Sequence, residues 1–209
     1  MTLHLLTSEW DLPEKPESFL DSDEIERMGR FVFEPDARRW SLFRAKAKRA
    51  LAGHTGGRIL PWLEGPGGKP RVDQPGLEFN LSHSETLAAL VVSDAGPVGV
   101  DLEPLDRAPT LLECEDSFCH PAERAELPVD TGSRAIALLH LWTAKEALLK
   151  AVGTGLQFPP TELIVRDDAG IGGPERCDQF HLRRPVDPAE IAHCLAVAVP
   201  RLVETVTLA

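Results

Sequence analysis

The spacing of apolar positions alternates between a helical and a strand-like period along the chain. Residues 21–33 and 36–51 carry apolar side chains at helical spacing, with Asp36 as a candidate N-cap and Gly53 as a stop. The opening segment, residues 2–7, is extended. Short apolar runs broken by Gly and Pro then predict strands. We place these strands at residues 59–63, 78–80, 87–93 and 98–103.

A second set of elements begins after the middle of the chain. Residues 134–152 form a long helical pattern, which Gly153 and Gly155 end. Three further apolar runs have the length of strands. They lie at residues 162–166, 179–183 and 193–199.

The order of these elements predicts the fold class. A helix followed by antiparallel strands occurs twice, although no sequence repeat relates the two halves. This order is typical of an α+β fold, here a pseudo-twofold duplication of two similar helix-and-sheet subdomains. We expect the subdomains to be residues 1–103 and residues 104–209, with a linker near residues 104–112.

Composition narrows the class of protein. Hydrophobic residues make up 43% of the chain and charged residues 26%, as in ordinary folded proteins. No apolar run approaches the roughly 20 residues that span a bilayer, and the start of the chain does not resemble a secretory signal. The four cysteines form no C-x-x-C pair, so we expect free thiols. We therefore expect a cytoplasmic protein that binds no membrane.

The charge balance argues against one class of partner. A net charge of −11 disfavours nucleic acid, whose phosphates attract basic surfaces. Basic residues are nevertheless concentrated within twelve positions. That cluster is either a solvated helix face or a phosphate-binding patch, and composition does not distinguish the two. Its members are Arg38, Arg39, Arg44, Lys46, Lys48 and Arg49.

Two carboxylates occupy alternate positions of the predicted strand at residues 98–103. Alternate residues of a strand share a face, so Asp101 and Glu103 are expected on the side opposite Val100. Both carboxylates could then reach one cation, and Gly99 leaves room for a close neighbour. Taken alone, the segment is explained at least as well by an edge strand with a solvated acidic face.

The helical pattern at residues 134–152 changes this balance. It is apolar nearly all round, and Glu146 lies in one stripe with Leu139, Trp142 and Leu149. A buried charge costs several kcal/mol unless it is paired or bound to a metal. A Glu–Lys pair with Lys150 one turn later is worth only about 0.3–0.5 kcal/mol on an exposed helix. A functional site accounts for the carboxylate better.

Together the three carboxylates predict a particular chemistry. Asp101, Glu103 and Glu146 form an all-oxygen set, which suits Mg²⁺ bound together with substrate phosphates. Lys145 and Lys150, with His83 elsewhere, would supply positive charge for those phosphates. The combination favours phosphoryl transfer, in which positioning and charge neutralisation carry most of the catalysis.

Four ordered motifs resemble the Sfp-type 4′-phosphopantetheinyl transferase family. Residues 68–70 read G-K-P, and residues 79–84 read F-N-L-S-H-S. Residues 99–103 read G-V-D-L-E. Residues 142–150 read W-T-A-K-E-A-L-L-K, followed at 153–156 by G-T-G-L. The last motif is the most specific, and the match extends from about Arg27 to Leu156.

The resemblance implies a function and a reaction. Enzymes of this family transfer the 4′-phosphopantetheine of coenzyme A to a serine hydroxyl of an apo acyl or peptidyl carrier protein, and 3′,5′-ADP leaves. By position, Asp101, Glu103 and Glu146 would bind Mg²⁺, with Mn²⁺ as an alternative. Glu146 would also act as the base on the serine, directly or through a water, and Lys150 would hold the phosphate next to pantetheine. Coenzyme A would lie between the two halves of a monomer.

The resemblance also implies residues that contact coenzyme A. Ser82 and His83 would contact its phosphates, and Lys69 its nucleotide end. Arg39 and Arg27 would contact the 3′-phosphate, although Glu24 stands where some members carry a basic residue. With the two lysines of the long helix, the expected contacts are Arg27, Arg39, Lys69, Ser82, His83, Lys145 and Lys150.

The acidic chain needs a local surface for a carrier protein. A segment with Phe118 and Glu123 resembles the part of the family that docks the carrier, and we expect an apolar surface over residues 118–127. Substituting Phe118 by Ala should then raise KM for the carrier and leave coenzyme A affinity unchanged. Two other functions fit fewer of the motifs: a non-catalytic module that binds coenzyme A or a carrier protein, and a magnesium-dependent phosphohydrolase.

Overall fold

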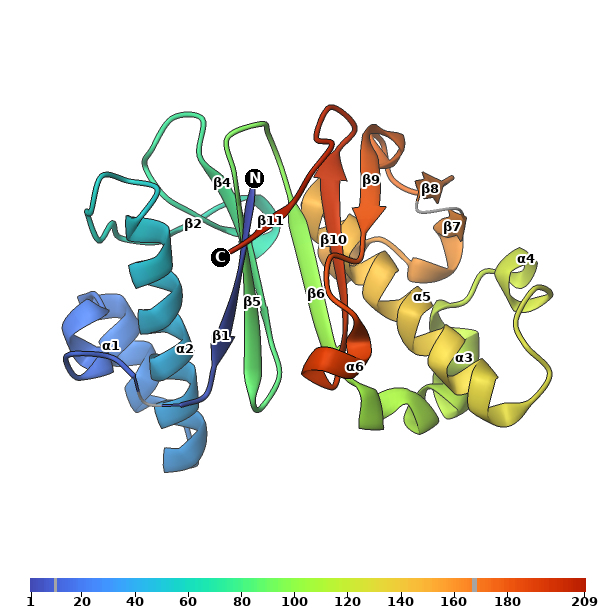
Figure 1. Ribbon diagram of the computed structural model, residues 1–209, viewed down its shortest axis with the longest axis horizontal. Helices are drawn as coiled ribbons and strands as arrows, with labels where there is room; N and C mark the ends of the chain where they lie inside the picture. The colour runs from blue at the N-terminus through green and yellow to red at the C-terminus, as the bar shows by residue number, and fades with distance from the viewer. Residues whose placement is uncertain (10, 167–168) are drawn as a thin grey trace.

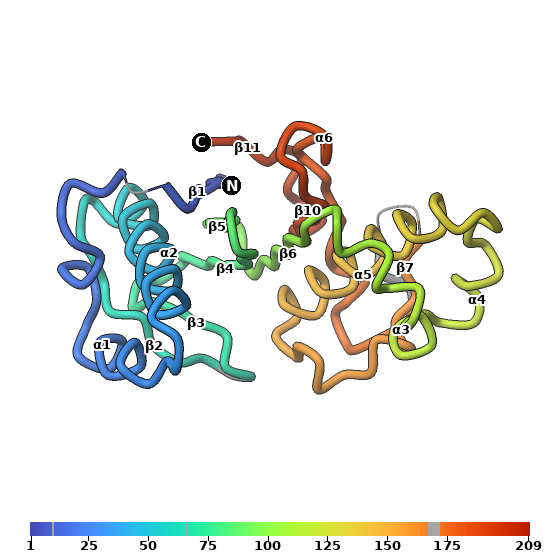
Figure 2. The backbone as a smooth tube through the Cα atoms, turned by 90° about the horizontal axis from the view of Figure 1, so that it is seen from below, coloured from blue at the N-terminus to red at the C-terminus, as the bar shows by residue number. Residues whose placement is uncertain are grey.

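Two sheets pack face to face between two long helices in the computed structural model, which describes residues 1–9, 11–166 and 169–209 (Figures 1 and 2). The first sheet has the order β11 (Thr207–Leu208), β1 (Thr2–Thr7), β5 (Leu87–Ser93), β4 (Glu78–His83). The second has the order β6 (Gly99–Pro104), β10 (His193–Pro200), β9 (Phe180–Arg183), β8 (Ala169–Ile171), β7 (Ile164–Arg166). A separate two-stranded sheet pairs β2 (Leu63–Glu64) with β3 (Pro70–Arg71).

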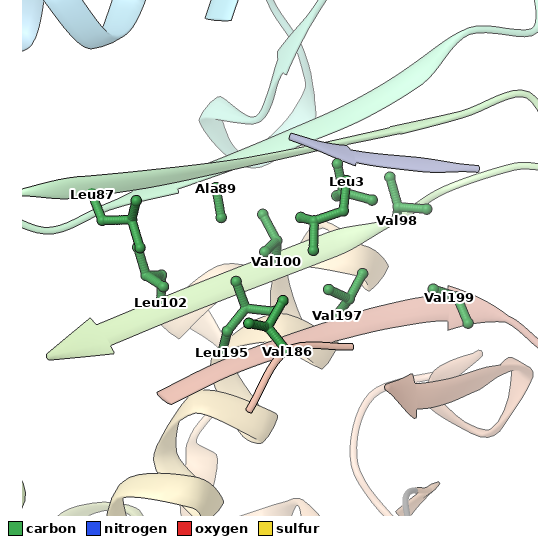
Figure 3. Close-up of a cluster of buried hydrophobic side chains, with 11 residues drawn as sticks. Leu3, Leu87, Ala89, Val98, Val100, Leu102, Val186, Leu195, Val197 and Val199 are labelled. Carbon is green, nitrogen blue, oxygen red and sulfur yellow. The ribbon is translucent and has the colours of Figure 1, made fainter. Parts of the chain in front are cut away.

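The core between the two large sheets comes from the alternation of apolar residues along their strands. Val98, Val100 and Leu102, at and just before β6, are at most 2% exposed and point toward the first sheet (Figure 3). Leu3 of β1 and Val197 of β10 belong to the same cluster. Burying this face forces the alternate residues of β6 to the opposite side of the second sheet.

Each large sheet is covered on its outer face by one long helix. Helix α2 (Glu34–Ala52) packs on the first sheet, and α5 (Thr131–Val152) packs on the second (Figure 2). The side chain of Asp130 caps the start of α5 by accepting a hydrogen bond from Ser133 N at 2.9 Å. Gly153 ends the helix in the left-handed conformation, with φ of 92°.

The remaining helices are short. They are α1 (Ser22–Gly29), α3 (Leu111–Phe118), α4 (Pro121–Arg124) and α6 (Pro188–Ile191). Single 3₁₀ segments lie at Pro16–Phe19, Pro66–Gly68, Leu105–Thr110, Gly155–Gln157, Pro160–Glu162 and Cys177–Gln179. Helix α1 begins with a reciprocal capping box between Asp21 and Glu24.

The structure confirms the α+β class and most of the predicted elements. The strand at residues 87–93 has the predicted bounds. Helix α2 begins at Glu34 rather than at Asp36, because Pro35 takes a first-turn position that needs no N–H donor. The strand expected at residues 59–63 is reduced to the short β2.

Strand pairing interleaves the two halves. Strand β6, from the end of the predicted first subdomain, pairs with β10 in the second sheet. Strand β11, from the end of the chain, pairs with β1 in the first sheet. The division at residue 103 and the pseudo-twofold relation both stay predictions.

The structure bears on two expectations from composition, the state of the cysteines and the presence of a membrane-spanning helix. The four cysteines, Cys114, Cys119, Cys177 and Cys194, are free thiols, as predicted. Within the described residues, no helix has the length and apolar character needed to cross a membrane.

Candidate active site

A close approach between β6 and α5 builds the site. A Cβ atom on Gly99 would lie 2.0 Å from Ala147 O and 2.5 Å from Ala151 N, so only glycine allows this contact. The bulky neighbour expected at Gly99 is therefore the backbone of α5. The residues of β6 that share the Gly99 face, Asp101 and Glu103, then point toward this helix.

Asp101 is the most buried carboxylate of the cluster, with 3% of its surface exposed. Its Oδ1 accepts hydrogen bonds from Ser82 Oγ at 2.9 Å and from Lys150 Nζ at 2.7 Å. Its Oδ2 is buried and has no hydrogen-bond partner within the described part of the chain. An unpartnered buried carboxylate oxygen is costly, and such atoms are uncommon outside functional sites.

Glu103 is held through one of its two oxygens. Trp142 Nε1 donates a hydrogen bond to Glu103 Oε1 at 3.2 Å. Arg107 Nη1 donates to the same oxygen, and its guanidinium carbon lies 5.7 Å from the centroid of the Trp142 ring. Neither of these two hydrogen bonds involves Glu103 Oε2.

Glu146 lies one helical turn before Lys150, with 3.9 Å between Glu146 Oε2 and Lys150 Nζ. Burial raises the pKa of the Glu146 carboxyl above its usual range. Lys150 partly opposes this shift, while the charges of Asp101 and Glu103 add to it. The three predicted carboxylates are thus close enough to interact electrostatically.

The carboxylate cluster fits a divalent cation by its chemistry but not by its present spacing. Within residues 1–9, 11–166 and 169–209, no three His, Cys, Asp or Glu side chains are spaced as a metal centre. The ammonium group of Lys150 lies against Asp101 and faces Glu146, so the three carboxylates do not converge on one point. The donors nevertheless fit a hard cation, because they are all oxygens and Asp101 Oδ2 has no other partner.

A small pocket of the first half includes His83, the residue that follows the Ser82 bonded to Asp101. It has a volume of about 220 Å³ and is lined by Arg27, Trp40, Phe43, Arg44, Gly68, Pro70, Leu81 and His83. The His83 ring stacks on Phe43 with 6.0 Å between centroids. Burial in this contact lowers the pKa of His83, and the charges of Arg39 and Lys150 lower it further, although much of the residue stays exposed.

Arg27 and Arg39, which were predicted to contact coenzyme A, both lie near His83. Arg27 stacks over Trp40, at 5.4 Å from the ring centroid, and lines the pocket. Arg39 pairs with Asp36 at 2.7 Å and lies close enough to His83 to shift its pKa. Arg27 and Arg44 therefore give the pocket two basic side chains, and Arg39 lies near its His83.

Comparison with known proteins matches this site to a family. The model of the 4′-phosphopantetheinyl transferase superfamily matches residues 97–194. The chain is 35% identical over 173 residues to the 4′-phosphopantetheinyl transferase HetI of Nostoc sp., an alignment covering 74% of this chain and 73% of HetI. The chain belongs to the 4′-phosphopantetheinyl transferase superfamily. The residues matched by the family model include the three carboxylates and Lys150.

Other relatives of this phosphopantetheinyl transferase have the same name. A putative 4′-phosphopantetheinyl transferase of Synechocystis sp. is 32% identical over 154 residues, which cover 71% of this chain and 63% of that protein. The 4′-phosphopantetheinyl transferase Sfp of Bacillus subtilis is 28% identical over 153 residues, which cover 71% of this chain and 67% of Sfp. The resemblance read from the motifs is thus confirmed at the level of the family.

Sequence reasoning did not anticipate that Lys69, Asn80 and Ser82 bond to the backbone at the edge of the second sheet. Three side chains of the first half bond to the free edge of β6. Lys69 Nζ donates to Val98 O at 2.8 Å, and Asn80 Oδ1 accepts from Val100 N at 2.8 Å. Ser82 Oγ accepts from Leu102 N at 3.3 Å. These bonds take the place of a neighbouring strand along this edge.

Arg44 is a second feature that the sequence reasoning did not single out. Its guanidinium lies 4.0 Å from the centroid of Trp62 and 5.5 Å from that of Trp40, and its Nε lies 2.7 Å from Glu24 Oε1. Burial lowers the pKa of Arg44, and the charge of Glu24 opposes that shift. The spacing of Trp40 and Arg44, one helical turn apart, was the available signal.

The phosphate role predicted for Lys145 is wrong. Lys145 is 0% exposed, and its ammonium group already has three acceptors. These are Phe118 O at 2.7 Å, Pro160 O at 2.8 Å and Glu123 Oε2 at 2.6 Å. Because an ammonium group has three donors, none is left for a substrate.

Phe118 cannot be part of the expected docking surface. Phe118 is 1% exposed and packs edge-on against Trp142, with 5.2 Å between ring centroids. Glu123 is 5% exposed and accepts hydrogen bonds from Val165 N and His120 N in addition to its pair with Lys145. Phe118 therefore belongs to the core, where a partner cannot reach it. Leu127 is half-buried and lines a pocket of about 370 Å³ together with Glu123 and Glu126, so the surface expected over the rest of residues 118–127 stays a prediction.

Two lysines of the basic cluster have a structural role that neither interpretation anticipated. Lys46 bonds to Thr7 O and pairs with Asp11. Lys48, 2% exposed, pairs with Glu24 and Asp21. These two lysines hold the first half together, whereas Arg39 and Arg44 lie toward the pocket.

Proposed function

We propose that this enzyme transfers 4′-phosphopantetheine from coenzyme A to a serine hydroxyl of an apo acyl or peptidyl carrier protein. The serine oxygen would attack the phosphorus next to pantetheine, the bond from that phosphorus to the diphosphate bridge would break, and 3′,5′-ADP would leave. The observation that carries this proposal is the acidic cluster of Asp101, Glu103 and Glu146 beside Lys150 and a basic pocket.

Glu146 would act as the general base on the serine. Its carboxylate would accept the serine proton, directly or through a water. Lys150 would bind the phosphate next to pantetheine through its ammonium group. The Lys150 side chain is 26% exposed. Substrate phosphate would then draw Lys150 away from Asp101 and free the carboxylates.

Asp101, Glu103 and Glu146 would hold Mg²⁺, or Mn²⁺, which would neutralise charge on the diphosphate of coenzyme A. The unpartnered Oδ2 of Asp101 supports this assignment. So does the raised pKa of Glu146. Burial raises it most, the charges of Asp101 and Glu103 add to the shift, and a cation would offset both effects.

Coenzyme A would lie along the pocket of the first half. Arg27, Arg39 and His83 would meet its phosphates there. Ser82 and Lys69 would reach the coenzyme only by sharing or exchanging their present bonds to β6 and Asp101. A cytoplasmic monomer with two pseudo-twofold halves completes the proposal.

A transfer assay tests the proposal. The full chain is incubated with coenzyme A, Mg²⁺ and each of a panel of apo carrier proteins, and intact-protein mass spectrometry follows the carrier. We expect a mass gain of one phosphopantetheine on a carrier with its serine, and none on the Ser→Ala carrier.

Two arms of the same assay separate the alternatives. A phosphohydrolase would release nucleotide from coenzyme A with no carrier present, and a binding module would bind coenzyme A without any transfer. Either result, from folded protein with the whole panel tested, would refute the proposal. Full activity in EDTA would refute the metal role alone.

A further inference from the structure

The two carboxylates of β6 share one arrangement. In each, the protein holds one oxygen with two donors: Ser82 and Lys150 on Asp101 Oδ1, Trp142 and Arg107 on Glu103 Oε1. The second oxygens, Asp101 Oδ2 and Glu103 Oε2, take no part in these hydrogen bonds. Asp101 Oδ2 is buried and has no hydrogen-bond partner among the described residues. A carboxylate anchored by one oxygen offers the second in a fixed direction.

Trp142 is well placed to fix Glu103. It lies on α5 one turn before Glu146, so its indole faces the same stripe of the helix. Its ring is wedged edge-on against the buried Phe118, which limits its rotation. The position of the N–H group is therefore set by the core of the second half, not by solvent.

We propose that Trp142 is a positioning residue, whose indole N–H orients Glu103 so that Oε2 faces the divalent cation. The inference rests on the proposed function. Hydrogen bonds from outside a metal centre orient its ligands, and removing one typically lowers metal affinity by about 10–100-fold. Ring packing against Phe118 alone would not need the N–H group.

The test separates the N–H group from the ring. Trp142→Phe keeps an aromatic ring against Phe118 and removes the donor to Glu103. Binding of Mn²⁺ to the full chain is measured from the free-ion signal in electron paramagnetic resonance. We expect about 10-fold weaker binding in Trp142→Phe, with the melting temperature retained.

Trp62→Phe is the matched control. The Nε1 of Trp62 is buried and has no hydrogen-bond partner among the described residues, and its ring packs on Phe79 at 4.6 Å between centroids. Losing that N–H breaks no bond to a carboxylate, so Mn²⁺ affinity should match the wild type. Equal Mn²⁺ affinity in wild type and Trp142→Phe would overturn the inference.

A second measurement uses the unchanged protein. In ¹⁵N-labelled wild type, the indole N–H signal of Trp142 should shift on saturation with Mg²⁺, and that of Trp62 should stay in place. An unshifted Trp142 signal in Mg²⁺-saturated protein would overturn the inference. The proposed function fails separately, if the wild type transfers nothing to any carrier.

Discussion

Two ionic clusters on different faces of α5 contrast sharply in how they are satisfied. Lys145 and Lys150 are five residues apart, so they point to different sides of the helix. On one side, all three donors of the buried Lys145 have acceptors, and both oxygens of the buried Glu123 have donors. On the other, Asp101 has a buried oxygen without a partner in the described chain, and Glu146 is destabilised as an anion.

This difference indicates which cluster is structural and which is functional. A buried polar network with all its partners fixes one packing of the core. A buried network with missing partners costs stability and is retained where it serves binding or catalysis. Residue type does not separate the two, because both clusters join carboxylates to a lysine of the same motif.

The largest effect is expected from breaking the satisfied cluster. Lys145→Met should lower the free energy of unfolding by about 3–5 kcal/mol, because it leaves Glu123 buried without its cation. Urea unfolding measures this loss. Transfer per folded molecule should stay close to wild type. A stable variant without activity would show that Lys145 acts on substrate after all.

Phe118 sharpens the comparison on the same side of the helix. Phe118→Ala should cost about 3–5 kcal/mol of unfolding free energy, because it empties a fully buried site. KM for the carrier, measured on the folded fraction, should not change. A raised KM with unchanged stability would restore the docking role that the sequence suggested.

Lys150 probes the open side. Lys150→Gln keeps a hydrogen-bond donor near Asp101 but removes the charge, and the transfer rate at saturating substrates should fall by about 10²–10³-fold. Steady-state kinetics with a competent carrier measures it. The control is Lys15→Gln, which changes an exposed lysine near the N-terminus. An unchanged rate would exclude Lys150 from the chemistry.

The smallest effect concerns pH. The pKa of Glu146 is raised in the folded state above the unfolded value of 4.5. Between pH 4.5 and the folded pKa, Glu146 is therefore mostly protonated in the folded state and mostly ionised in the unfolded state. Ionised Glu146 therefore costs stability at pH 7 and nothing below pH 4.5. Wild type and Glu146→Gln should unfold alike at pH 4, and the variant should be the more stable at pH 7. The opposite order at pH 7 would contradict the raised pKa.

Much of the fold and part of the site could be predicted from the sequence. Periodicity placed Asp101 and Glu103 opposite the Val100 face, and the glycine at 99 signalled a close neighbour. The role of Lys145 could not be read, because its partners Glu123 and Pro160 come from other segments. The burial of Phe118 against Trp142 likewise depends on how α3 packs on α5. A motif identifies which residues recur, whereas only packing shows which of them face the substrate.

The same limit explains the edge of β6. The F-N-L-S-H-S motif suggested contacts to phosphates, but Asn80 and Ser82 also bond to the backbone of β6. Pairing between edges of different sheets leaves no periodic signal in either strand. It became visible only when both sheets were in place.

One paired measurement tests the central claim, that the unsatisfied cluster is the catalytic one. Glu146→Gln and Glu123→Gln make the same change at a half-buried and a buried carboxylate. Transfer to an apo carrier and urea unfolding at pH 7 are measured for both variants. We predict that Glu146→Gln loses transfer by about 10²–10⁴-fold and is as stable as wild type or more so. Glu123→Gln should lose stability and keep transfer per folded molecule. Active Glu146→Gln protein would contradict the account.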